Sequence, residues 1–180
     1  MNPHPDSPDL GLRGERLTVR YDRSLPLVLD GQSIAVPVGR IVALVGPNGS
    51  GKSTLLKALA RQLCPQDGRV VLDGRDAAAL TRLAFARRVG MLFQENTAPS
   101  GLSVEDPAYY GRHAHLRLFD ALSPADHEAV ERALLLAGVA ALRDAPVQQL
   151  SAGQRQLAWI AMALAQETQY LFLDEPTTFL

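Results

Sequence analysis

The chain has 180 residues, a formal net charge of −1 at pH 7, 47% hydrophobic residues, 14 Gly and 12 Pro. This composition excludes collagen, coiled coil and wholesale disorder, and the balanced charge gives no basic surplus to indicate nucleic acid as a partner. The single Cys64 excludes a disulfide framework within the chain and suits a reducing compartment. No apolar run approaches the roughly 20 residues of a spanning helix, so we expect a soluble, cytoplasmic protein without membrane insertion.

The N-terminal part predicts a loose tail followed by two strands. Residues 1–14 begin with closely spaced prolines and are expected to form a flexible tail. The β-formers over 16–21 and 32–37 predict antiparallel strands, with a turn at Asp30-Gly31.

The next elements alternate between strands and helices. The near-continuous apolar run Arg40–Val45 predicts a strand buried on both faces. A helix is expected from Lys52 to about Leu63, a short strand over 69–72, a helix over 81–89 and a strand over 90–93. This alternation is typical of an α/β fold.

The middle of the chain predicts helices and loops, without a convincing strand over 95–147. Ser123 is followed by Pro and then by an acid at the third helical position, which predicts a capped helix that stops at Gly138. A helix is expected again from Ser151, and residues 169–173 form a final apolar strand. The expected architecture is an α/β core with a helical insertion.

A Gly-rich loop, GPNGSGKS, follows the first apolar strand and fits the phosphate-loop pattern. Its glycines let backbone N–H groups approach phosphate oxygens, and the next helix presents its positive end to the anion. Lys52 can reach the β- and γ-phosphates, and the Ser53 hydroxyl can ligate Mg²⁺. An ordinary strand–helix turn is the alternative. The expected nucleotide-binding residues of this loop are Gly46, Pro47, Asn48, Gly49, Ser50, Gly51, Lys52, Ser53 and Thr54.

Two acids follow the final apolar strand. At the carboxyl end of a buried parallel strand, Asp174 can hold Mg²⁺ and Glu175 can act as the general base that polarises the attacking water. Apolar strands that end in acids are common, so this interpretation depends on the phosphate loop.

The helix that begins near Ser151 starts with the sequence LSAGQRQ. Ser151 and Gln154 form an S-x-x-Q capping box, and Gly153 exposes its backbone at a helix start that suits an anion. Without the other motifs, a helix cap with no further role would be the better interpretation.

LSAGQ resembles the LSGGQ signature of ATP-binding cassette (ABC) ATPases. Gln94 matches the family's Q-loop, and Tyr21 lies where the family has its adenine-stacking loop. The resemblance implies ATP and Mg²⁺ as cofactors and a P-loop NTPase core with a mostly parallel sheet, an N-terminal antiparallel β subdomain and an inserted helical subdomain. Residues 15–94 and 156–180 would form the core, and 95–155 the helical subdomain with the signature motif.

The resemblance also implies a role for each of the site residues. Two copies would pair head to tail as a homodimer, and each signature motif would contact the nucleotide of the other copy. The implied catalytic residues are Glu175, Gln94 and Lys52. The implied nucleotide-binding residues outside the phosphate loop are Tyr21, Ser151, Gly153 and Gln154. The implied Mg²⁺ ligands are Ser53, Gln94 and Asp174.

Three stretches, YYGRHAHL, QRQLAWIAMALAQET and LDEPTTFL, resemble the ATPase subunits of ferric-siderophore, haem and related metal-chelate importers. This implies ATP hydrolysis that powers import through a membrane permease. The permease would dock on the helical subdomain near residues 94–112, and the subunit would sit peripherally on the inner face of the membrane. A soluble ABC ATPase acting on nucleic acid or ribosomes, and a truncated non-catalytic nucleotide-binding remnant, are the alternatives.

The chain departs from the family's pattern at several places. Relatives continue with further strands, a loop Asp and a switch His, whereas the histidines here all precede Asp174, so we expect a C-terminally truncated chain. Pro107 lies where the helical subdomain has an aliphatic residue. With Ser103 as the N-cap, Pro107 would be the fourth helical residue, remove only the first intrahelical hydrogen bond and kink the helix. His113 and His115 are expected to be surface polar residues rather than a metal pair.

Overall fold

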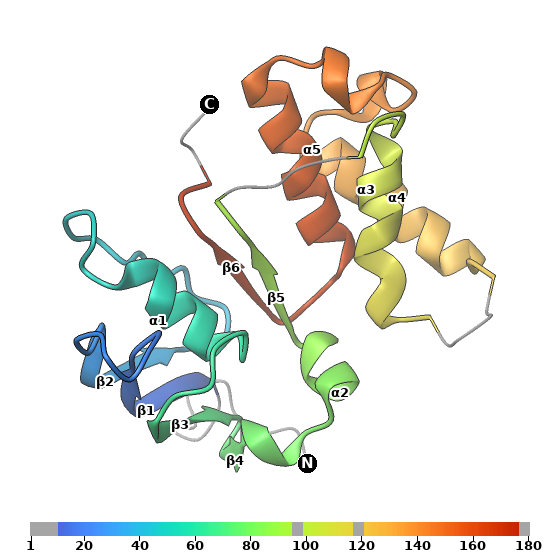
Figure 1. The fold of residues 1–180 in the computed structure, drawn as a ribbon. Helices are drawn as coiled ribbons and strands as arrows, with labels where there is room; N and C mark the ends of the chain where they lie inside the picture. The colour runs from blue at the N-terminus through green and yellow to red at the C-terminus, as the bar shows by residue number, and fades with distance from the viewer. Residues whose placement is uncertain (1–10, 95–98, 117–120, 177–180) are drawn as a thin grey trace. The chain divides into compact units, whose positions relative to one another are not determined.

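The computed structural model describes residues 11–94, 99–116 and 121–176. The chain divides into two compact units, Met1–Phe85 and Ala86–Leu180, whose helices and strands are drawn in Figure 1. This division falls at a different place from the boundaries expected after residues 94 and 155, which remain predictions about subdomains.

The first unit contains a four-stranded antiparallel sheet in the order β2-β1-β3-β4. The predicted antiparallel N-terminal strands are therefore confirmed. Residues 12–14 belong to β1 rather than to the expected tail, because the Leu12 side chain is fully buried. The turn expected at Asp30-Gly31 is wrong, since both residues lie inside β2. The strands are β1 (Leu12–Val19), β2 (Leu29–Val36), β3 (Asp67–Leu72) and β4 (Arg75–Asp76).

Helix α1 (Lys52–Leu59) packs its buried Leu59 against β1, where a Cβ on Gly14 would come within 3.1 Å of Leu59 Cδ2. The helix is shorter than expected because Arg61 adopts a left-handed backbone with φ 57. Its guanidinium donates to the carbonyl of Ala77 at 2.7 Å and lies 5.0 Å from the Phe85 ring centroid. Ala77 begins the 3₁₀ helix η1 (Ala77–Ala79), and Phe85 belongs to α2 (Arg82–Ala86).

The buried strand expected at Arg40–Val45 is not present in the described structure. Residues 41–47 carry no helix or strand, and Ile41 and Val45 are 101% and 90% exposed. Apolar composition supplies the tendency to form a strand, but a strand exists only when its N–H and C=O groups pair with a neighbour. Among the described residues, neither sheet contains this segment.

The second unit contains a parallel pair, β5 (Val89–Leu92) and β6 (Tyr170–Leu173), in register from Val89↔Tyr170 to Leu92↔Leu173. Both strands lie close to their expected positions. The helix expected over 81–89 is shorter, because β5 already begins at Val89. Among the described residues, β5 and β6 make up the parallel part of the fold.

The rest of the second unit is helical, as expected, and Figure 1 shows α3, α4 and α5 side by side. A Cβ on Gly111 would lie 2.4 Å from the Met162 carbonyl oxygen, so glycine is required for the close approach of α3 to α5. In the described parts of 99–150, the extended pairing is one isolated bridge between Ser103 and Pro146. The helices are α3 (Glu105–Gly111), α4 (Pro124–Leu136), α5 (Ala152–Ala165), and the 3₁₀ helices η2 (Arg112–Ala114), η3 (Ala140–Leu142) and η4 (Val147–Gln149).

The helix caps follow the sequence closely, with one exception. Ser123 and Ser151 each form the expected capping box. At α3 the N-cap is Val104 rather than Ser103, which places Pro107 at the third helical position. The N–H groups of the first helical turn have no intrahelical partner in any sequence, so this proline removes no helix hydrogen bond. None of the helices in the described part of the chain is long and apolar enough to cross a bilayer.

Candidate nucleotide-binding site

The phosphate-loop motif forms an exposed loop that leads into α1. Gly49 and Gly51 have left-handed backbones with φ 79 and φ 91, which other residues rarely adopt. Gly51 is the N-cap of α1, which has no side-chain cap and no acid in its first turn. The helix therefore starts without a side-chain anion of its own at its positive end, as suits a bound phosphate.

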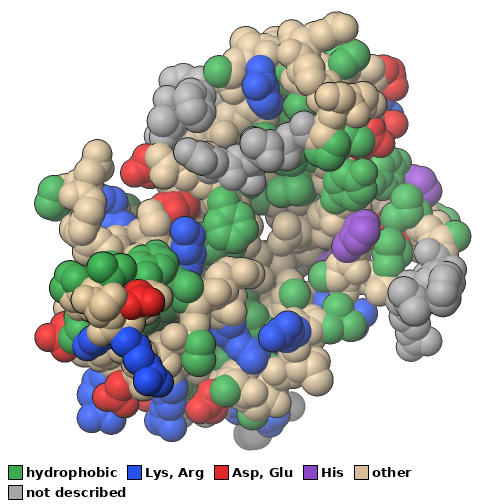
Figure 2. All heavy atoms as spheres, in the orientation of Figure 1, with side chains coloured by type: hydrophobic (Ala, Val, Ile, Leu, Met, Phe, Trp, Pro, Cys, Tyr) green, Lys and Arg blue, Asp and Glu red, His purple; other side chains and the backbone are tan. Residues whose placement is uncertain are grey.

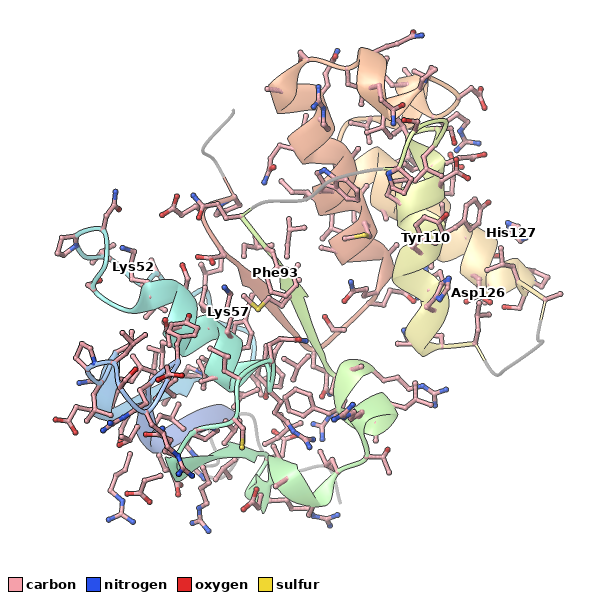
Figure 3. The ribbon with its side chains drawn as sticks, viewed as in Figure 1. Lys52, Lys57, Phe93, Tyr110, Asp126 and His127 are labelled. Carbon is pink, nitrogen blue, oxygen red and sulfur yellow. The ribbon has the colours of Figure 1, made fainter. Side chains whose placement is uncertain are left out.

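Lys52 lies at the junction between the loop and α1, as Figure 3 shows. Its ammonium donates to the carbonyl oxygens of Gly46 and Pro47, both at 2.9 Å. The side chain thus folds back over the loop and links the start of α1 to the first two residues of the motif. An ammonium can exchange these neutral acceptors for phosphate oxygens, which are stronger partners because they are charged.

Tyr21 lies on a bend shortly after β1 and contacts α1 directly. Its hydroxyl is 3.0 Å from the hydroxyl of Thr54, which follows Ser53 on the first turn of the helix. Thr54 is 5% exposed, whereas Tyr21 is 55% exposed. The structure therefore brings together a predicted base-stacking residue and a predicted phosphate-loop residue from distant parts of the sequence.

The second unit brings Gln94 and Glu175 together at the carboxyl ends of β5 and β6. The Gln94 side-chain nitrogen donates to a Glu175 carboxylate oxygen at 2.6 Å. The backbone N–H of Asp174 donates to Leu92 O at 3.1 Å, which extends the strand pairing beyond β6. Asp174 is buried, whereas Glu175 is exposed and has a left-handed backbone with φ 48, a conformation that costs about 1 kcal/mol or more for a non-glycine residue.

The signature residues form the N-terminus of α5. The Ser151 hydroxyl accepts from the Gln154 backbone N–H at 3.2 Å, and the Gln154 side-chain oxygen accepts from the Ser151 N–H at 3.0 Å. Both residues are exposed, and Gly153 between them is half-buried. The arrangement leaves a capped helix start at the surface.

These residues have the chemistry that a magnesium nucleotide requires. A loop rich in left-handed glycines, on a helix start without a side-chain cap, fits a polyphosphate. The space beside Gly49 is open, because a Cβ added there would meet nothing within 4 Å. The hydroxyl of Ser53, the amide oxygen of Gln94 and the carboxylate of Asp174 are oxygen donors of the kind Mg²⁺ prefers. The structure groups the residues as Tyr21 with the phosphate loop, Gln94 with Glu175, and Ser151 with Gln154, each group within one compact unit.

An ion-pair network centred on the buried Arg112 was not anticipated from the sequence. Arg112 is 5% exposed and donates to Asp126 at 2.9 Å, to Glu167 at 3.0 Å and to the Ala165 carbonyl, the last residue of α5, at 2.7 Å. Arg132 also pairs with Glu167 at 2.7 Å. Arg112 thus ties the ends of α3 and α5 to the start of α4, through partners that are far apart in sequence and follow no local pattern.

The carboxyl group of Asp126 has a lowered pKa, chiefly because of its hydrogen bonds to the helix cap. Hydrogen bonds from the Ser123 hydroxyl and backbone N–H, with a smaller contribution from the Arg112 guanidinium, together lower its pKa from 3.8 to about 2 against the effect of burial. Figure 3 shows Asp126 and the neighbouring His127 on α4. The pattern around Ser123 predicted the cap, but the pairing with Arg112 needed the tertiary structure.

The histidines of the second unit have separate partners. The His113 ring packs edge to face against Tyr110, with centroids 5.7 Å apart, whereas His115 Nε2 is 2.8 Å from the Gln166 carbonyl oxygen. His127 Nδ1 is 2.8 Å from the Tyr109 hydroxyl. Tyr110 is 50% exposed on α3 and is labelled in Figure 3.

The surface of the first unit carries both signs of charge. Basic and acidic side chains lie intermixed over its four-stranded sheet in the view of Figure 2, and Arg69 pairs with Glu15 at 2.8 Å. A face with mixed charges differs from the basic stripe with which nucleic-acid-binding proteins contact a phosphate backbone.

The chain is similar to named transport proteins along most of its length. It is 44% identical over 169 residues to the ferric enterobactin transport ATP-binding protein FepC of Escherichia coli (strain K12), a match that covers 94% of this chain and 62% of that protein. It is 43% identical to the "Probable siderophore transport system ATP-binding protein YusV" of Bacillus subtilis (strain 168), over 92% of this chain and 60% of that protein. The chain thus spans about 60% of the length of these relatives.

Solved structures and a family model agree with these matches. The fold superposes with a TM-score of 0.78 and 31% identity on cbiO1 from Clostridium perfringens, part of the ABC transporter complex cbiONQ, covering 96% of this chain and 68% of that one. A family model described as ABC transporter matches residues 29–178, which include the phosphate loop, the signature motif and both acids. The chain therefore belongs to the ABC transporter family, in its ATP-binding domain.

Proposed function

We propose that this chain is the ATP-binding and hydrolysing part of a subunit that powers import of a ferric siderophore or a related metal chelate through a membrane permease. The names of the relatives support the cargo and the direction, and they do not favour an ATPase acting on nucleic acid or ribosomes. The phosphate loop on the start of α1, with Lys52 folded over it, is the observation that carries the ATP part of the proposal.

In this proposal the first unit holds the nucleotide. The loop N–H groups and Lys52 bind the phosphates, and the Lys52 ammonium exchanges the carbonyls of Gly46 and Pro47 for phosphate oxygens. Tyr21 stacks on the base, and Ser53, Gln94 and Asp174 hold Mg²⁺. The ion, when bound, neutralises charge that develops on the transferred phosphoryl group.

The hydrolytic step uses the acid that follows Asp174. Glu175 accepts a proton from a water molecule as the water oxygen bonds to the γ-phosphorus, and the bond from that phosphorus to the β–γ bridging oxygen breaks to give ADP and phosphate. Gln94, which donates to Glu175 in this structure, orients the carboxylate. Both side chains are exposed, so water has access to them.

The remaining site residues act between subunits in this proposal. Ser151, Gly153 and Gln154 at the exposed start of α5 contact the nucleotide of a second copy, which makes the working form a homodimer. The helical part around α3 receives the permease, with the exposed Tyr110 as an aromatic anchor. The subunit would then be held on the inner face of the membrane through its permease.

The test compares the two lysines of the chain. Lys52→Ala should abolish ATP binding in calorimetry, because it removes the cation from a loop built of neutral donors. Lys57→Ala, in the last turn of the same helix, is the matched control and should bind ATP as the unsubstituted chain does. Tight ATP binding by Lys52→Ala would contradict the proposal, and ATP binding without phosphate release would indicate the non-catalytic alternative.

A further inference from the structure

The hydrogen bond between Tyr21 and Thr54 joins two hydroxyl groups that are 33 positions apart in the sequence. One partner, Thr54, is buried on the first turn of α1, immediately after Ser53. The other partner lies on an exposed bend beyond β1, with 55% of its surface accessible. The contact is 3.0 Å long, within the range of a good O–H···O hydrogen bond.

The surroundings constrain the two ends of this contact differently. Thr54 is β-branched, helical and buried, so its hydroxyl has few accessible positions. Tyr21 sits on an irregular, exposed segment, where an aromatic side chain without a partner would sample several rotamers. The bond therefore acts mainly on Tyr21, and it holds the hydroxyl end of the ring beside the first turn of α1.

We propose that the Tyr21 hydroxyl is a positioning group: through Thr54 it fixes the aromatic ring beside the phosphate loop, so that the ring is prearranged to stack on a nucleobase. The inference rests on the proposed function, because it takes the first turn of α1 as the place where phosphates bind. It goes further by assigning a role to the hydroxyl, which stacking itself does not require. A ring that is held in place before binding loses less conformational freedom when the ligand arrives.

The proposal distinguishes two parts of the ligand. A nucleotide uses both the ring and the loop, whereas inorganic tripolyphosphate uses the loop alone. Loss of the hydroxyl should therefore weaken binding of ATP and leave tripolyphosphate binding unchanged. Because stacking on an aromatic ring tolerates any base, GTP should weaken as ATP does.

The experiment measures the dissociation constants of Mg-ATP and Mg-tripolyphosphate by calorimetry for Tyr21→Phe, which keeps the ring and removes the hydroxyl. We expect about fivefold weaker binding of ATP, the size of effect that one hydrogen bond produces, with unchanged tripolyphosphate affinity. Tyr109→Phe is the matched control, since it removes a hydroxyl contact of 2.8 Å to His127 in the other unit and should change neither constant.

Variants at Thr54 test the other end of the bond. Thr54→Ser keeps the hydroxyl and should keep the ratio of the two constants. Thr54→Val keeps the shape without the hydroxyl and should change that ratio as Tyr21→Phe does, and the double variant should add no further change to it. Using the ratio removes any direct effect of Thr54 on phosphate affinity.

The outcomes separate this inference from the proposed function. An unchanged ATP constant in Tyr21→Phe, or equal weakening of both ligands, would overturn the positioning role while the phosphate loop stands. Tyr21→Ala should weaken ATP by about tenfold or more, and an unchanged value would remove Tyr21 from base binding altogether. Failure of the unsubstituted chain to bind tripolyphosphate would instead overturn the phosphate loop on which both proposals rest.

Discussion

The side-chain amide of Gln94 donates a 2.6 Å hydrogen bond to the carboxylate of Glu175, although the two residues are 81 positions apart. The contact follows from the parallel register of β5 and β6, in which Leu92 lies opposite Leu173 and both chains leave the sheet at the same edge. A carboxylate only accepts, so the amide presents its nitrogen to Glu175. The Gln94 oxygen then remains as the atom that would ligate Mg²⁺.

Replacement of Glu175, the proposed general base, should separate binding from hydrolysis. Glu175→Gln keeps the shape of the side chain but cannot accept a proton, so we expect ATP affinity to be retained and phosphate release to fall by about 100-fold or more. Glu128→Gln is the control, because Glu128 lies on α4 with a side chain that is 73% exposed. Turnover of Glu175→Gln at the rate of the control would show that Glu175 is not the base.

Two helix caps of the same type should differ in their effect on activity. Ser123→Ala and Ser151→Ala each remove a capping box, and each should destabilise the fold by about 1 kcal/mol or more in thermal or denaturant unfolding. If the start of α5 contacts a second nucleotide, only Ser151→Ala lowers ATP turnover beyond what its stability loss explains. Equal turnover of both variants would reduce Ser151 to a helix cap.

Because Arg112 and Asp126 form a buried ion pair, we expect the free energy of unfolding to depend strongly on Asp126. Asp126→Asn leaves the buried guanidinium with a weaker partner and should destabilise the second unit by about 3 kcal/mol in denaturant unfolding. Asp144→Asn, at an exposed acid, should change stability by less than about 0.5 kcal/mol. A similar small change for both variants would mean that the ion pair contributes little.

The lowered pKa of Asp126 fixes the sign of its pH dependence. Because the pKa is lower in the folded chain, the carboxylate contributes stability above its unfolded value of 3.8, and this contribution is lost as the pH falls to about 2. We expect the unfolding free energy of the unsubstituted chain to fall between about pH 4 and pH 2 more steeply than that of Asp126→Asn. Parallel curves for the two proteins over this interval would contradict the assignment.

The exposed aromatic residue on α3 should matter for the permease and not for ATP. Tyr110→Glu places a charge where an apolar anchor is expected, so co-purification with the cognate permease should be lost while ATP binding by the chain is unchanged. Leu136→Glu is the matched control, since Leu136 is a 77% exposed apolar residue on α4 outside the proposed docking region. Retained co-purification of Tyr110→Glu would refute the placement.

Features that depend on a few neighbouring residues could be predicted from the sequence. Gly49 and Gly51 of the phosphate loop take left-handed conformations that favour glycine, and both serine capping boxes form as expected. The parallel pair β5 and β6 also appears at nearly the predicted positions, because each strand is a short apolar run with clear ends. The family followed from the order of Tyr21, the phosphate loop, Gln94 and the LSAGQ motif, and the comparisons confirm it.

Features that depend on partners far apart in the chain required the tertiary structure. The apolar run at Arg40–Val45 had the composition of a buried strand, yet it lies outside both described sheets, because pairing is not a property of the run itself. In the same way, the partners of Arg112 and the hydroxyl contact of Tyr21 with Thr54 leave no local pattern. The sequence by itself determined the local chemistry, since turns and caps are settled over three or four residues. Only the tertiary structure decided which of these groups touch. Each such contact closes a long loop of chain, and the entropy cost of closing that loop cannot be read from the preferences of neighbouring residues.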